Sequence, residues 1–183
     1  MTHVEKRLAH FHLGADAGLW LVSREPHPRE AREAWMRDAP AMLRIGVHFD
    51  AVRLPASVVH RAAGGAGREV VEAAFRRAGI EGAVIVDHSG RWYYALVPPG
   101  TAAGWREEGC EALGEGCYLG VPGPYRAEPP GSYWLLTPPG GEADLCEPRN
   151  LRELSGHGVE EVPRPVWGRR GARDGADPMI DHP

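Results

Sequence analysis

The amino-acid sequence predicts a single α/β (α+β) domain in which helices flank a mixed or antiparallel sheet. Two observations predict this class. Between residues 49 and 120, short apolar runs rich in β-branched and aromatic residues alternate with segments of helical periodicity. Proline and glycine separate these segments as turns. With 183 residues the chain suffices for one ordinary domain. We expect that domain at 15–157, after an N-terminal segment 1–14 and before a flexible tail 158–183.

The first elements are expected to be helices. The apolar run from Ala15 to Ser23 is short, and we interpret it as a helix. Residues 28–38 predict a second helix, because Pro28 suits a first helical turn and three apolar residues recur at helical spacing, namely Ala31, Ala34 and Trp35. Pro40 follows this helix, and the residue before a proline is biased away from helical angles.

Extended chain is expected next. Apolar and polar residues alternate from Met42 to Leu54, which predicts two strands that meet around residues 48–50. Pro55 begins a short helix, and residues 68–78 form an amphipathic helix that Gly79 ends.

A β-hairpin is the clearest local prediction. The β-branched residues 83–86 form one strand, residues 87–90 supply turn chemistry, and residues 92–97 form the returning aromatic strand. The remaining expected elements are a short helix after Pro98-Pro99-Gly100, strands at 118–121 and 133–137, and a last helix after Pro148.

Composition narrows the function classes. A formal net charge of −4 gives no global basic field of the kind that attracts nucleic acid, although a local basic face remains compatible with it. The three cysteines lack CxxC spacing, which indicates free thiols in a reducing compartment and no zinc site; they are Cys110, Cys117 and Cys146. No stretch approaches the length of an apolar membrane span. We therefore expect a cytoplasmic protein without membrane contact.

Three motifs carry a family resemblance. They are Phe49-Asp50-Ala51-Val52-Arg53-Leu54-Pro55, Gly90-Arg91-Trp92-Tyr93-Tyr94-Ala95-Leu96-Val97-Pro98-Pro99-Gly100 and Leu113-Gly114-Glu115-Gly116-Cys117-Tyr118-Leu119. In this order of elements, residues 15–155 resemble small actinobacterial members of the bifunctional DNA primase/polymerase (prim-pol) N-terminal domain family. The resemblance implies a primase-like sheet of RRM-related topology that carries the site.

The resemblance also implies which residues catalysis requires. Active members hold divalent metal with an Asp-x-Asp pair on a strand and contact nucleotide phosphates through a Ser-x-His element, because phosphoryl transfer needs metal ions to neutralise charge. Here Asp50 stands alone with Val52 two residues on, and Arg53 would repel a metal. After Ser89, Trp92 stands where the family wants a histidine. We therefore expect a catalytically degenerate pseudoenzyme without metal or cofactor.

An active metal-dependent primase or nucleotidyltransferase is the alternative. A cross-strand pair of Asp50 and Asp87, with His88 as a general base or phosphate contact, would rebuild a Mg²⁺ site. We favour a simpler interpretation, in which both aspartates bond backbone amides at turns and His88, like His48, is a solvated or hydrogen-bonded surface group.

Two further groups are candidate ligand contacts. Arg44, Arg53 and Arg91 could share one sheet face and bind nucleotide or phosphate, because guanidinium groups fork onto phosphate oxygens. Three unconnected solvated charges are an equally good interpretation. Trp92 and Tyr94 fall on the same face of their strand and could stack on bases, although such aromatics more often pack in a core.

These observations leave three functional hypotheses. The leading one is a prim-pol-like binding or accessory protein that has lost catalysis and is associated with nucleic acid or nucleotide in DNA replication or maintenance. The active enzyme is the second. The third is a protein-interaction module without nucleic acid, which uses an exposed aromatic face or Trp167 of the tail. The sequence predicts neither the ligand nor the oligomeric state.

Overall fold

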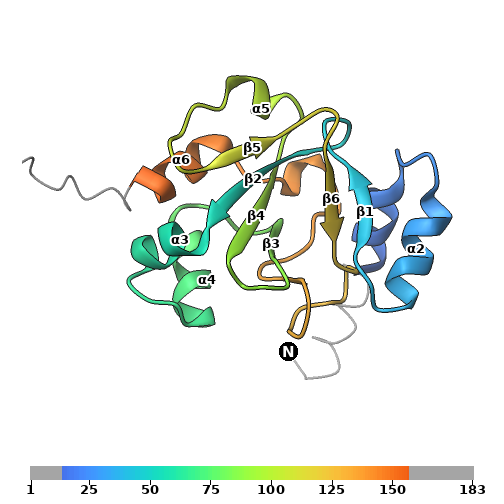
Figure 1. Ribbon diagram of the computed structural model, residues 1–183, viewed down its shortest axis with the longest axis horizontal. Helices are drawn as coiled ribbons and strands as arrows, with labels where there is room; N and C mark the ends of the chain where they lie inside the picture. Colours follow the sequence, from blue (N-terminus) through green and yellow to red (C-terminus); the bar gives the residue numbers. More distant parts are fainter. Residues whose placement is uncertain (1–13, 157–183) are drawn as a thin grey trace, which may run out of the picture.

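The computed structural model describes residues 14–156 (Figure 1). The expectations for the segment before residue 14, for the tail 158–183 and for Trp167 lie outside the described residues. Within 14–156 no helix is long and apolar enough to cross a membrane.

The described chain contains helices and strands in the expected order, with the addition of one strand and one 3₁₀ turn. A helix covers residues 14–22. The elements that follow are α2 (Pro28–Met36), β1 (Ala41–Arg44), β2 (Asp50–Pro55), α3 (Ala56–Ala63), α4 (Arg68–Arg77), β3 (Val84–Val86), β4 (Trp92–Val97), α5 (Thr101–Gly104), β5 (Glu111–Leu113), β6 (Tyr118–Val121), β7 (Tyr133–Trp134), the 3₁₀ turn η1 (Glu142–Asp144) and α6 (Pro148–Gly156). The sequence did not predict β5.

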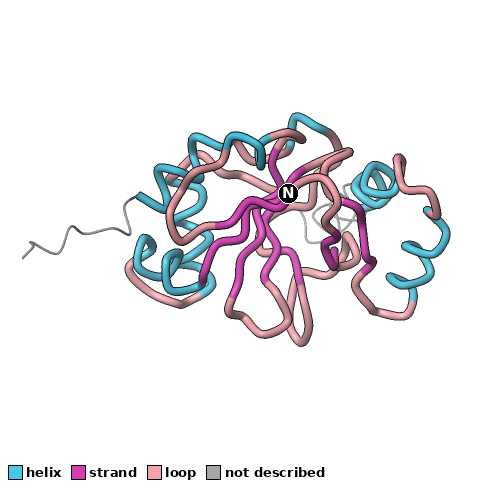
Figure 2. The backbone as a smooth tube through the Cα atoms, turned by 45° about the horizontal axis from the view of Figure 1, so that its top comes forward, coloured by secondary structure: helices cyan, strands magenta, loops and turns pink. Residues whose placement is uncertain are grey.

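The strands form two sheets. Five strands pair in the order β5-β2-β4-β3-β7, and β1 pairs with β6 in a separate two-stranded sheet, with every pairing antiparallel. The expected α+β fold with an antiparallel sheet is confirmed. The expectation of one sheet is wrong, because the chain turns sharply between β1 and β2 and sends them to different partners. Figure 2 shows the small sheet beside the large one.

Gly46 permits that turn. Its φ of +93° lies in the left-handed region, and its N–H donates to the carbonyl of Phe49 over 2.8 Å. A Cβ at this position would lie 2.6 Å from the Cα of Glu115. Both the backbone angle and the space therefore require glycine between β1 and β2.

One face of the five-stranded sheet is buried under helices. The register places Val52 opposite Ala95 and Leu54 opposite Tyr93, so these side chains share a face. Tyr93 lies 5.9 Å, between ring centroids, from Phe75 of α4 and is hydrogen-bonded to His60 of α3 over 3.0 Å. Helices α3 and α4 thus cover this face at one end of the molecule, away from α2 and the small sheet (Figure 1).

The opposite face of the sheet has a fully buried part and a half-buried part. Ala51, Ile85 and Leu96 are fully buried in the core. Further along the same strands, Arg53 and Trp92 are only half-buried. Tyr94, which lies opposite Arg53 in the register, is half-buried as well. The part of the face that carries these three residues is only partly covered.

Candidate functional site

Asp50 begins β2 and has a structural partner. The residue is 1% exposed, and its Oδ2 accepts a hydrogen bond from the backbone N–H of Ala102 in α5 over 2.8 Å. Its Oδ1 has no hydrogen-bond partner in the described structure. The expectation of a bond to a backbone amide is confirmed, but the amide is 52 residues away in the chain rather than nearby. Asp50 thereby ties α5 to the sheet.

Asp87 organises the turn of the hairpin. Its Oδ2 accepts from the Ser89 hydroxyl over 2.6 Å, and its Oδ1 accepts from the backbone N–H of Trp92 over 3.0 Å. Burial alone would raise the pKa of Asp87, but these hydrogen bonds outweigh it and the pKa lies below its usual value. His88 beside it is exposed, with Nδ1 3.8 Å from Asp87 Oδ2. The turn interpretation of Asp87 is confirmed.

The structure does not bring Asp50 and Asp87 together. Asp50 lies opposite Val97 at one end of β4, whereas Asp87 bonds the backbone of Trp92 at the other. Five residues of strand separate these ends by about 16 Å. Ions of a two-metal centre lie only about 4 Å apart, so the two carboxylates do not form one. Across 14–156, no group of three or more His, Cys, Asp or Glu side chains is placed to hold a metal ion.

The three arginines do not converge on one site. Arg44 lies in β1 of the small sheet, where its Nε is 3.8 Å from Glu25 Oε2. Arg91 lies in the hairpin turn and donates from Nε to the Ser89 hydroxyl over 3.2 Å. Only Arg53 lies on the open part of the large sheet. The expected three-arginine phosphate site is therefore wrong, because β1 pairs outside the sheet that holds Arg53.

The open sheet face, defined here by Arg53, Trp92, Tyr94 and Glu111, is the cluster in which expected residues do meet. Arg53 lies opposite Tyr94 in the register with β4 and opposite Glu111 in the register with β5. Its guanidinium carbon lies 4.4 Å from the centroid of the Trp92 ring, a cation–π contact. Its Nη2 lies 2.5 Å from Glu111 Oε2. Trp92 and Tyr94 share this face, as the period of a strand requires.

Glu111 alters the charge of this face. It neutralises Arg53, so the open sheet face carries aromatic rings and a paired cation rather than an unbalanced positive charge. Burial raises the pKa of Tyr94, whose hydroxyl therefore stays protonated at neutral pH. Sequence patterns did not indicate Glu111, because the three-residue strand β5 lacks a recognisable alternation.

The expectation that His48 is a surface group is wrong, because the residue is 5% exposed and has one polar partner. Its Nε2 lies 2.7 Å from the Ser23 hydroxyl, and its ring packs on Trp20 with centroids 4.8 Å apart. Burial lowers the pKa of His48 and the charge of Arg24 lowers it further, whereas Glu142 opposes both. Its Nδ1 has no partner in the described structure, so the Ser–His pair lacks the orienting carboxylate of a catalytic triad there.

The cysteines are free thiols, as the sequence predicted. Burial raises the pKa of Cys146 to about 12 and also raises the pKa of Cys110. Nucleophilic chemistry needs the thiolate, so neither group is activated.

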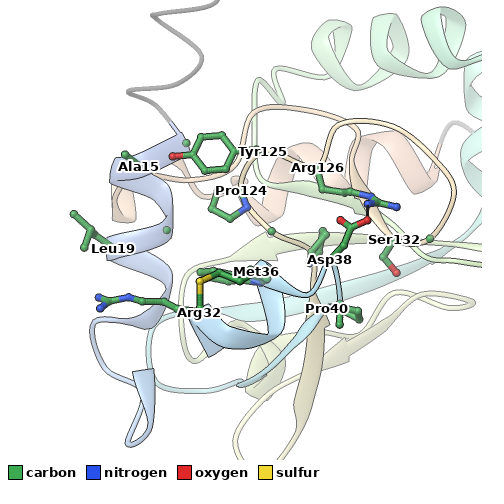
Figure 3. Close-up of a pocket in the computed structure, with 17 residues that line it drawn as sticks. Ala15, Leu19, Arg32, Met36, Asp38, Pro40, Pro124, Tyr125, Arg126 and Ser132 are labelled. Atoms are coloured by element: carbon green, nitrogen blue, oxygen red, sulfur yellow. Dashed lines mark ion pairs between the residues drawn. The ribbon is translucent and has the colours of Figure 1, made fainter. Parts of the chain in front are cut away.

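A second candidate site is an apolar groove that sequence inspection missed (Figure 3). It encloses about 690 Å³ between the helix over 14–22, α2 and the loop 122–132. Leu19, Met36 and Tyr125 line it with large apolar surfaces, and an ion pair of Asp38 with Arg126 stands at one side. The sequence of this loop indicated only a Pro/Gly-rich crossing. Its packing against two helices therefore had no signal in the sequence.

The open sheet face and the apolar groove are two candidate binding surfaces among the described residues. The open sheet face combines residues of the first two motifs quoted above, and the apolar groove lies outside all three. Comparisons of the chain with protein-family models, with curated proteins and with solved structures found no match.

Proposed function

We propose that this protein is a non-catalytic binding protein built on a prim-pol-like scaffold, which holds the bases of single-stranded nucleic acid on the open sheet face. The observation that carries the proposal is that Trp92, Tyr94 and Arg53 lie together on one solvent-accessible face of adjacent strands. We place its role in DNA replication or maintenance in the cytoplasm, in line with its free cysteines.

The positions of the two aspartates support the loss of catalysis. A primase-type reaction requires carboxylates grouped around divalent metal. Asp50 instead accepts from an α5 amide, and Asp87 holds the hairpin turn at the far end of β4. Each carboxylate thus has a structural role at its own site.

The geometry of β4 supports base stacking. It is the middle strand of the five, and Trp92 and Tyr94 stand two residues apart on it with their side chains on one face. Stacking of a base on an aromatic side chain contributes about 1–3 kcal/mol and tolerates any base. Arg53 adds a cation beside the Trp92 ring. We therefore expect binding with little sequence preference.

The charge pattern predicts an unusual salt dependence. For single strands the logarithm of affinity falls with a slope of about 0.7 per phosphate neutralised. Arg53 is already paired with Glu111, and the chain carries a net charge of −4. We expect affinity in which stacking dominates, so that doubling the salt weakens binding only slightly.

A titration with labelled oligothymidylate tests the proposal. We expect Trp92→Ala to weaken binding by about 1–3 kcal/mol, because it removes a stacking surface. Tyr118→Ala is the matched control, since Tyr118 is exposed on β6 of the other sheet. Absence of binding, or an equal effect of the two substitutions, would refute the binding site.

A separate assay tests the loss of catalysis. We expect no metal-dependent nucleotide incorporation on a primed template with the full chain. Robust incorporation that disappears in Asp50→Asn would overturn the proposal in favour of the active enzyme.

A further inference from the structure

Exposed apolar side chains gather in the apolar groove. Among residues 14–156, seven large hydrophobic side chains are exposed, and three of them line this groove. These are Leu19 at 59%, Met36 at 77% and Tyr125 at 56% exposure. Contiguous exposed apolar surface on a soluble domain marks a place where another segment binds. We therefore expect another segment to bind in the groove.

The chain itself enters the described structure at this groove. Gly14, the first described residue, lines it. A Cβ at Gly14 would lie 2.2 Å from Tyr125 Cε1, so the ring of Tyr125 lies directly against the backbone there. Gly18 likewise brings the helix close to Pro124, whose Cγ would be 3.1 Å from an added Cβ. The described chain therefore begins at the wall of the groove.

We propose that residues 1–13 of the same chain occupy the apolar groove. Five of these thirteen residues are large and apolar, and three of them, Val4, Leu8 and Phe11, follow one another at spacings of four and three. That spacing is typical of a segment that buries one face against a partner. Leu13, another large apolar residue, is adjacent to Gly14.

Length and linkage favour this occupant over a separate molecule. Thirteen residues span at most about 43 Å when extended and about 20 Å when helical, so the segment reaches across a groove of this volume in either form. A segment joined directly to the groove wall binds at a high effective concentration, which short linkers raise to about the millimolar range. Few contacts then suffice to keep the apolar surface covered.

Hydrogen–deuterium exchange on the full chain tests the proposal. We expect the amides of residues 2–13 to exchange at least about tenfold more slowly than in a synthetic peptide of the same sequence. Met36→Glu places a charge in the groove and is expected to remove this protection. Val70→Glu is the matched control, because Val70 is 42% exposed on α4, away from the groove.

The outcomes separate the possible occupants. Protection that is lost in Met36→Glu, kept in Val70→Glu and independent of protein concentration supports docking within one chain. Exchange of 2–13 at the rate of the free peptide overturns the proposal. Protection that rises with concentration together with a doubled molecular mass also overturns it, since the occupant is then a second copy. Equal protection in the two variants shows that the segment lies elsewhere.

Discussion

Asp50 and Ala102 are joined by a hydrogen bond of 2.8 Å that links the first residue of β2 to the first turn of α5. The aspartate that a primase-type strand would use for metal is here buried and bonded to a backbone amide. In this protein the most suggestive carboxylate of the sequence stabilises the fold.

The Asp50 bond predicts a stability effect. We expect Asp50→Ala to lower the free energy of unfolding by about 1–3 kcal/mol, because it leaves the N–H of Ala102 without its acceptor. Asp50→Asn retains an oxygen acceptor and should lose less. Urea unfolding of the three proteins measures this. Equal stability of Asp50→Ala and the unaltered protein would contradict it.

Glu111 predicts a gain of binding. Glu111→Gln removes the charge that neutralises Arg53, which leaves the guanidinium beside Trp92 without its carboxylate partner. We expect tighter binding of oligothymidylate, by up to about 1 kcal/mol, and a steeper salt dependence. Glu108→Gln makes the same charge change at another exposed site and serves as the control. Equal gains in both variants would indicate a general charge effect instead of a local one.

His48 predicts how stability depends on pH. Burial, with the charge of Arg24, lowers the pKa of His48 in the folded state below its ordinary value of 6.5. The unfolded state then binds the proton more readily. The contribution of His48 to the free energy of unfolding is therefore fully present above about pH 6.5 and is lost as the pH drops below that value. Unfolding free energies measured from pH 7.5 to 5 should show this slope, and His48→Gln should flatten it. An unchanged slope in the variant would assign the effect to other groups.

Substitution of Gly46 by alanine is expected to lower stability more than the same substitution at Gly90. Gly46→Ala combines a φ of +93° with a Cβ 2.6 Å from the Glu115 backbone. Gly90 has a φ of +68° but nothing within 4 Å of an added Cβ. Strain at a positive φ costs about 1–2 kcal/mol, so Gly90→Ala should lose that much and Gly46→Ala distinctly more. Thermal unfolding measures the loss of stability in both variants. Equal losses would mean that the Glu115 segment moves to make room for the added Cβ.

Local patterns predicted the elements with strong signals. The helix at α2 and the hairpin of β3 and β4 followed from periodicity and turn residues, both of which act between near neighbours in the chain. Strand β5 has three residues and no alternation, so only its pairing with β2 makes it a strand. For the same reason the role of Glu111 had no signal in the sequence.

The candidate site was predicted only in part, because some of its features depend on near neighbours in the chain and others depend on which strands pair. The shared face of Trp92 and Tyr94 follows from the two-residue period of a strand, which holds wherever the strand lies. Whether Arg44 joins Arg53 depends on which strand β1 pairs with, and the separation of Asp50 from Asp87 depends on the register of β2 against β4. The apolar groove depends on a loop and two helices that are distant in sequence.

The sequence by itself determined the order of the helices and strands other than β5, the hairpin turn around Asp87 and the faces on which alternate residues of β4 fall, because these depend on backbone preferences over a few residues. The tertiary structure decided which carboxylates and guanidinium groups meet, what Asp50 bonds and where apolar surface stays exposed. Those contacts join residues that are tens of positions apart, and only the packing of strands and helices around a common core fixes them.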